Sequence, residues 1–523
     1  MSDSTQSEFS GWRSFLWPVH RHELRKLLPM LVILFLITFD YNMLRTMKDT
    51  LVVATGKQSG AEVIPFIKLW VMFPGSVALT FLFTWLSNRF SRERVFYVMM
   101  TLFLAYFALF IGVLYPLRDI LHPHEFADSL QAALPIGLKG FVAMIRNWSF
   151  TTFYVMSELW GNIVLFLLFW GFANQITHLG EAKRFYAILG IATNISGIIA
   201  GEIAVEVSRT SFFSFIPHGS QAWDQQILVL VSLVILGGIL AMGIFRWMHT
   251  HILDETNGET VASTKGEVKG KMSMRENFRY LFNSRYLLCI ALIAIAYNVV
   301  INLVEVLWKS QVHSLYADPS AYNLYMNRVM MIIGLFATLT SFGITGNLIR
   351  KTGWKFTAML TPVILLLTSV AFFGSFFWKE AIGDLAQLPW GLTPLAIVVF
   401  FGTLQNCLSR GAKYTVFDAT KEMAFIPLSQ ECKIKGKAAI DGVCMRLGKS
   451  GGAAIHQVLL VTFSSLALSA PYVVGFLLVM VSLWMGSVSS LGKQFNALEA
   501  GEGESEPAYQ PEPKPEPVFQ GQS

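Results

Sequence analysis

Long uninterrupted apolar runs recur along the whole chain. Each contains about 20 residues or more, enough to cross roughly 30 Å of hydrocarbon as a helix. Because the bilayer interior offers the backbone no water, runs of this kind form helices. Charged residues make up only 14% of the chain, against about 25% in a typical soluble domain, and the short alternating segments of a β-barrel are missing. The sequence therefore predicts an all-α polytopic membrane protein.

The breaks between the apolar runs predict about twelve transmembrane helices. They are expected near residues 28–47, 61–86, 95–116, 149–177, 185–205, 226–246, 287–309, 326–349, 356–378, 392–412, 437–465 and 470–492. One long polar connection divides them six and six. Two six-helix halves joined in this way are typical of major-facilitator-like transporters.

This division sets the expected segments of the chain. The first six-helix half is expected at 28–247 and the second at 287–492, joined by a cytoplasmic linker at 248–286. Residues 1–27 form a cytoplasmic N-terminal segment that runs directly into the first apolar stretch, so we expect this helix to be retained as an anchor. The tail at 493–523 is rich in Pro and Glu, and is expected to be disordered and cytoplasmic.

Lys and Arg are concentrated in the connections on one side of the predicted spans. The triplet Arg89, Arg92 and Arg94 lies there, as does the cluster from Lys265 to Arg285. The positive-inside rule then places both termini in the cytoplasm. The net charge of +6 thereby orients the protein in the bilayer and does not indicate a nucleic-acid partner.

Charged residues inside the predicted spans mark candidate sites, because a charge at mid-span costs roughly 2.5–3.5 kcal/mol on insertion scales. In the first span Tyr41, Arg45 and Lys48 stand at i, i+4 and i+7, on one helical face. Two cations beside an aromatic ring suit a phosphate and a base. The alternative is that Arg45 and Lys48 extend to the external membrane interface.

Lys68 lies about two turns inside the second span, among Ile, Phe and Trp side chains. It has no acidic residue at i±3 or i±4, so a ligand or a distant carboxylate has to compensate its charge. The alternative is again a lysine that reaches the outer interface. The lack of a local partner favours a role in anion binding.

Two predicted spans carry polar stripes on otherwise apolar helices. The fourth has Glu158 and Asn162 at i and i+4, and the seventh has Asn298, Asn302 and Glu305 at i, i+4 and i+7. Such stripes are expected to face the protein interior. Carboxylates in an anion pathway can neutralise its lysines while no substrate is bound, and so act as gates. The alternative is interhelical hydrogen bonding for packing.

The eleventh predicted span is rich in cations and small residues. Gly448-Lys449-Ser450 fails the spacing of a phosphate-binding P-loop and lies in a membrane helix. Arg446 and Lys449, at i and i+3, are nonetheless candidate phosphate contacts. Lys437 is a further candidate in the same segment, although it can pair with Asp441 at i+4.

Nothing in the sequence supports catalysis, a metal site or a cofactor. The segment His122-Pro-His124-Glu125 is expected to be a solvated turn and not a metal site. The four cysteines show no paired spacing and are expected to be inert thiols: Cys289, Cys407, Cys432 and Cys444.

Four stretches carry a recognisable pattern: Met47-Lys48-Asp49 with Leu51-Val52-Val53, Phe153–Gly161 around Glu158, Phe169–Thr177, and Lys435–Asp441 through Gly448-Lys449-Ser450-Gly451-Gly452. Together they resemble the nucleotide transporter (ATP:ADP translocase) family of obligate intracellular bacteria and plant plastids, and most of all its chlamydial members. The resemblance covers about residues 20–500.

The resemblance implies a secondary transporter in the inner membrane of a bacterium, not an enzyme. It would exchange external (host) ATP for internal ADP, with a monomer as the simplest assembly. The family's important lysines and glutamates match Lys68, Glu158, Glu305 and Lys449, with Lys437 as a competitor for the last position.

Contacts to the nucleobase are less well determined by the sequence. The candidates are five aromatic or amide side chains near the charged residues: Tyr41, Tyr154, Asn162, Asn298 and Asn302. The alternative function on the same fold is a proton-coupled nucleoside triphosphate importer, in which Asp40, Glu158 or Glu305 carries the proton.

Overall fold

The protein is described by a computed structural model. The described residues are 19–58, 60–177, 179–210, 221–253, 284–343, 345–382, 392–428, 436–437 and 439–499. Within them every regular element is a helix, and there is no strand. Most of the predicted linker (254–283), the first part of the N-terminal segment and most of the tail lie outside these residues.

The first half is built from six helical stretches, several of them interrupted by π-helical turns. They are α2 (Arg21–Thr50) with η1 (Leu51–Thr55); α3 (Val63–Phe66), η2 (Ile67–Met72) and α4 (Phe73–Arg89); α5 (Arg92–Leu109) with η3 (Phe110–Leu114); α9 (Trp148–Leu159), η5 (Trp160–Trp170) and α10 (Gly171–Ile176); α11 (Leu179–Arg209); and α12 (Ala222–Met248) with η6 (His249–Leu253). The segment between the third and fourth stretches forms α6 (Arg118–Leu121), α7 (His124–Ala133), η4 (Ile136–Leu138) and α8 (Lys139–Arg146).

The second half repeats this plan. Its elements are α15 (Arg285–Leu315), α16 (Pro319–Gly343), α17 (Thr345–Ile382), α18 (Pro394–Ala412) with η8 (Lys413–Phe417) and α19 (Asp418–Ala424), η9 (Ile440–Cys444) with α21 (Met445–Phe463), and α22 (Leu466–Glu499). The break expected between 326–349 and 356–378 falls at Gly353, inside the range of α17. Its φ of +79° is a conformation that favours glycine.

Ten helical stretches of the described chain are long and apolar enough to cross a membrane. Helices α16 and α21 fall outside these ten, so the number twelve stays a prediction. The expected boundaries were too short in places: α2 and η1 together cover 21–55 instead of 28–47. An apolar run ends at Lys48 and Asp49, whereas the helix continues because both side chains are buried and paired.

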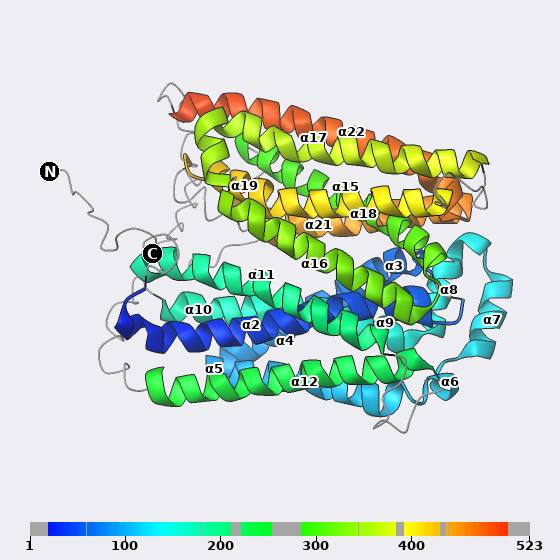
Figure 1. Cartoon of the computed structure of the whole chain (residues 1–523), viewed down its shortest axis with the longest axis horizontal. Helices are drawn as coiled ribbons and strands as arrows, with labels where there is room; N and C mark the ends of the chain where they lie inside the picture. The colour runs from blue at the N-terminus through cyan, green and yellow to red at the C-terminus, as the bar shows by residue number, and fades with distance from the viewer. Residues whose placement is uncertain are drawn as a thin grey trace, which may run out of the picture.

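The two halves lie side by side, the first in the lower part of Figure 1 and the second in the upper part. Helices α11 and α16 pack against each other between them; for example, Gly201 contacts Met331. Helices α6, α7 and α8 gather at one end of the molecule (right in Figure 1), which we call the cap end. The first helix of each half is the most buried of the ten spans: 61% of the apolar stretch is buried in α2 with η1, and 78% in α15. These two helices carry most of the site described next.

Candidate functional site at the junction of the halves

Lys48 is buried in the protein interior near the cap end of α2. Only 2% of the residue is exposed, so the alternative in which it extends to the membrane interface is wrong. Its Nζ lies 3.1 Å from Asp49 Oδ1 and 3.1 Å from Glu158 Oε1 of α9. It also lies 4.0 Å from the centre of the Tyr154 ring, a cation–π contact. The first half therefore holds this cation between two carboxylates and an aromatic face.

Lys309 of α15 joins this group to the second half. Its Nζ lies 2.7 Å from Asp49 Oδ2 and 2.9 Å from Glu305 Oε1. Arg410 Nη2 of α18 lies 3.0 Å from the same oxygen of Glu305. Alternating charges thus form one continuous chain, which we call the junction chain: Glu158, Lys48, Asp49, Lys309, Glu305 and Arg410. It crosses from one half to the other through the ion pair of Asp49 with Lys309.

Lys68 contacts the second half through an amide and not through a carboxylate. Its Nζ donates to Asn302 Oδ1 at 2.5 Å, while Asn302 Nδ2 donates to the backbone carbonyl of Asn298. Lys68 lies close enough to Glu305 and Lys309 to interact with their charges. It is carried by the π-helical turn η2, and a second π-helical stretch, η5, begins two residues after Glu158. Such turns are frequent at functional sites.

Arg45 and Tyr41 lie one to two turns deeper on α2, and both are partly exposed. Arg45 donates a hydrogen bond to the hydroxyl of Tyr414 in η8. Tyr41 packs against Gly161 of η5, where a Cβ atom would lie 2.7 Å from the Tyr41 ring. The predicted face of Tyr41, Arg45 and Lys48 is therefore directed to the junction between the halves.

Lys449 and Arg446 are exposed, and among the described residues neither has an ion-pair or hydrogen-bond partner. Lys449 lies close enough to Glu158 of the first half for their charges to interact. The position of α21 is fixed by two glycines that pack on α15: a Cβ atom would lie 2.7 Å from Asn298 Cβ at Gly448, and 2.9 Å from Asn302 Cβ at Gly452. Lys449 is thus an unpaired cation facing a carboxylate of the other half.

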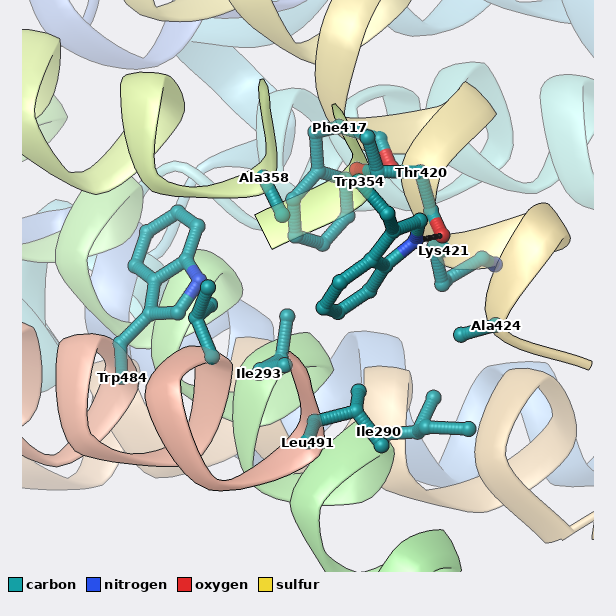
Figure 2. A pocket seen from close by; sticks show the side chains of 11 residues that line it. Ile290, Ile293, Trp354, Ala358, Phe417, Thr420, Lys421, Ala424, Trp484 and Leu491 are labelled. Carbon is teal, nitrogen blue, oxygen red and sulfur yellow. Dashed lines mark hydrogen bonds between the residues drawn. The ribbon is translucent and has the colours of Figure 1, made fainter. Parts of the chain in front are cut away.

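Lys437 and Asp441 do not pair with each other, contrary to one of the expectations. Lys437 Nζ lies 2.5 Å from Glu422 Oε2, and Asp441 Oδ1 lies 2.6 Å from Lys421 Nζ. Both pairs therefore link η9 and its flanking residues to α19 inside the second half. Lys421 also lines a narrow, mainly apolar pocket (Figure 2), in which the Trp354 indole donates to the carbonyl of Thr420. This pocket lies within the second half, away from the junction chain.

Cations outnumber carboxylates where the two halves meet. The cations are Lys48, Lys68, Lys309 and Arg410, and the carboxylates are Asp49, Glu158 and Glu305. Arg45 and Lys449 add two further positive charges nearby. Fixed positive charges in a poorly solvated region attract anions strongly. The geometry therefore suits a polyanionic ligand.

The predicted nucleobase contacts are not equally available in this conformation. The Tyr154 ring is fully buried beneath Lys48. Asn298 and Asn302 are buried and donate to backbone carbonyls of their own helix. Tyr41 and Asn162 are partly exposed, so they are the candidates that a ligand can reach here.

Four residues of the junction were not predicted from the sequence: Asp49, Lys309, Arg410 and Tyr414. Asp49 stands next to the candidate Lys48, and Lys309 stands at i+4 from the candidate Glu305. Each buried charge needs a partner of opposite sign, and a search for such partners in the sequence would have found both residues. Arg410 ends an apolar run, so it has the pattern of a residue at the membrane edge. Tyr414 has no local signal.

The segment around His122 is not a solvated turn. His122 is 6% exposed, and its Nε2 lies 2.7 Å from the Ser149 hydroxyl. Burial, with a smaller effect of His124, lowers the pKa of His122 to about 4. Among the described residues no cluster of His, Cys, Asp and Glu is suited to hold a metal ion. The histidine therefore contributes to the packing of the cap end.

The sequence of this chain matches the profile of the TLC ATP/ADP transporter family over residues 2–495. This chain belongs to that family. It is 45% identical to ADP,ATP carrier protein 1 of Chlamydia pneumoniae, covering 96% of this chain and 97% of the relative. It is 41% identical to the chloroplastic ADP,ATP carrier protein 2 of Arabidopsis thaliana, covering 92% and 76%. The resemblance inferred from the motifs is confirmed, and this TLC-family chain is a transporter and not an enzyme.

Solved structures confirm the fold of this TLC-family transporter. A bacterial homologue of the iron transporter ferroportin, in an inward-facing state, matches with a TM-score of 0.53 at 13% identity, covering 92% of this chain and 100% of the other. The xylose transporter XylE from E. coli, in an inward-open conformation, matches with a TM-score of 0.51 at 12% identity, covering 91% and 98%. At these identities the likeness concerns the fold alone, which is major-facilitator-like.

Proposed function

We propose that this transporter exchanges external ATP for internal ADP by alternating access of its two halves. The observation that carries the proposal is the junction chain, which crosses from one half to the other and has a surplus of positive charge around it. Phosphate oxygens can replace the carboxylates that pair with its lysines, because both are strong acceptors for charged donors. The names of the relatives support adenine nucleotides as the anion.

The role of each candidate phosphate contact is assigned from the group with which it pairs in this structure. Lys449 and Arg446 are exposed and without a partner in the described chain, so they meet the phosphates first. Lys48 and Lys68 become available when Glu158 and Asn302 release them. Arg45 is placed to contribute, whereas Lys437, paired with Glu422, is the weakest candidate.

Glu158 and Glu305 act as gates in this proposal. Each holds cations of the junction while no nucleotide is bound, Glu158 in the first half and Glu305 in the second. Asp441, which pairs with Lys421 inside the second half, would have only an indirect part in gating. Tyr41 and Asn162 are proposed to contact the base, and Tyr154, Asn298 and Asn302 would do so only after rearrangement.

The proposed setting is the inner membrane of a bacterium, with both termini cytoplasmic and the cap end external. The proposed order of segments is the one expected from the sequence, although the helices run from Arg21 to Leu253 in the first half and from Arg285 to Glu499 in the second, beyond the expected 28–247 and 287–492. ATP carries one more negative charge than ADP, so exchange moves net charge across the membrane. Each such charge is driven by about 2.3 kcal/mol per 100 mV.

Uptake of labelled ATP into proteoliposomes tests the proposal. Vesicles preloaded with ADP should accumulate label, and vesicles without internal nucleotide should not. Lys449→Gln should lower uptake at least tenfold, because it removes the unpaired cation opposite Glu158. Lys493→Gln, which changes an exposed lysine of α22, is the matched control and should behave like the wild type.

Two results would contradict the proposal. Uptake into empty vesicles that rises with an imposed pH gradient would favour proton-coupled import of nucleoside triphosphates over exchange. Equal uptake by Lys449→Gln and Lys493→Gln would remove Lys449 from the binding site.

A further inference from the structure

Asp40 is a buried carboxyl group that the proposed exchange does not use. It lies in the middle of α2 with 0% of the residue exposed. Neither of its carboxyl oxygens has a hydrogen-bond partner. On the facing helix, a Cβ atom at Gly237 of α12 would overlap Asp40 Oδ1, so the carboxyl group lies directly against the backbone of α12.

No charged group of the described chain acts on Asp40. The titratable residues of the elements around it lie toward the ends of those elements. On α12 there is no titratable residue between Asp224 and Arg246, and on α11 there is none between Tyr186 and Glu202. On α5 there is none between Tyr97 and Tyr106. The titratable residues of α9 and η5 are Tyr154 and Glu158. Tyr41 and Arg45 of α2 itself interact with Glu158 and Tyr414, not with Asp40.

An ionised carboxylate in such a place would be strongly unfavourable, because it would have lost water without gaining a cation or a donor. The neutral acid avoids most of this cost. It also fits the close approach of α2 to Gly237, where no space remains for a water molecule between side chain and backbone.

We propose that Asp40 is a proton-binding site: its uncharged acid form permits the close packing of α2 on α12, and loss of the proton releases α2. The same helix carries Tyr41, Arg45 and Lys48, so a shift of α2 displaces the residues that face the other half. Protonation of Asp40 is therefore required for transport, and alkaline conditions reduce transport by removing this proton to water.

The pH profile of nucleotide exchange tests this site. We expect wild-type exchange in proteoliposomes to fall several-fold between pH 7 and pH 9. Asp40→Asn has the shape of the neutral acid and cannot ionise, so its rate should change by less than about twofold over the same range. Asp119→Asn, which alters an exposed carboxylate of the cap end, should keep the wild-type profile. An Asp40→Asn profile that falls like the wild type would overturn the proposal.

Infrared spectroscopy keeps the proposal testable if Asp40→Asn does not transport. Purified wild-type protein at pH 7 should show the C=O band of a protonated carboxylic acid. The band should be absent from Asp40→Asn and present in Asp40→Glu. Absence of this band from the wild type, or its persistence in Asp40→Asn, would exclude a protonated Asp40. These outcomes do not depend on which nucleotide is carried, so they are separate from failure of the proposed function.

Discussion

At the scale of single residues, the buried charges of the junction chain share their partners. Lys309 has two carboxylate partners, Asp49 and Glu305, and each of these has a second cation within 3.1 Å. Within the junction chain, only the two end members, Glu158 and Arg410, have a single ion-pair partner. Removing a partner from a buried pair costs more than the pair itself contributes, because the remaining charge is left without water or counter-ion. A polyanion avoids this cost by replacing the partner it displaces.

Lys309→Gln should therefore be strongly destabilising, by about 3–5 kcal/mol. It leaves Asp49 and Glu305 buried with fewer counter-charges. The matched control is Lys57→Gln, since Lys57 and Asp119 form an exposed pair at the same cap end, 3.9 Å apart, whose loss should cost less than about 1 kcal/mol. The thermal unfolding midpoint in detergent measures both. Equal midpoints for the two variants would show that Lys309 is not a buried partner.

His122, which lies outside the membrane spans, should make the stability of the protein depend on pH. Its folded pKa of about 4 lies below the reference value of 6.5, so the folded state favours the neutral ring. The resulting stability is present above about pH 6.5 and is lost as the pH falls toward 4, to an extent of about 2–3 kcal/mol. The unfolding midpoint of the wild type should fall across this window more than that of His122→Gln. His22→Gln, which changes an exposed histidine, should keep the wild-type slope; if His122→Gln keeps it too, His122 is not the responsible group.

At the scale of elements, apolar runs predicted where helices lie but not where they end or how they are interrupted. Lys68, Glu158 and Glu305 were identified because a charge inside an apolar run is unfavourable in any fold. The partners Arg410 and Tyr414 come from helices distant in sequence, and no spacing rule brings them to Glu305 or Arg45. The π-helical turns at Lys68 and after Glu158 depend likewise on packing between helices, which a single apolar pattern does not encode.

The contact of α21 with α15 determines where Lys449 stands. At Gly448 an added Cβ would lie 2.7 Å from Asn298 Cβ and 2.9 Å from the Ile295 carbonyl oxygen, so Gly448→Ala should separate the helices. We expect a loss of about 1–3 kcal/mol and reduced ATP uptake. Gly475→Ala in α22 is the control, because nothing lies within 4 Å of its Cβ and alanine favours a helix by up to about 1 kcal/mol. Wild-type uptake and stability for Gly448→Ala would contradict this packing.

At the scale of the whole molecule, the bonds between the halves are concentrated near the cap end. Besides the junction chain, Thr46 donates to Asn327 Oδ1, Thr50 donates to Asn323 Oδ1, and Asn323 Nδ2 donates to Ser208. These residues lie in the last turns of α2 and α11 and the first turns of α16. The described chain thus has its halves joined at the end that we propose to be external, and alternating access requires these contacts to break.

Cross-linking this end should stop transport. The side chains of Thr50 and Asn323 are in contact, with 3.2 Å between the hydroxyl and amide oxygens, so the double variant Thr50→Cys/Asn323→Cys should form a disulfide on oxidation. We expect the oxidised protein to bind nucleotide from the cytoplasmic side but not to exchange it, and a reductant to restore exchange. Each single variant, treated with the same oxidant, controls for effects on Cys289, Cys407 and Cys444, which are free in the described chain. Because rocking of two rigid halves must separate α2 from α16 at this end, unimpaired exchange by the cross-linked protein would exclude that mechanism of transport.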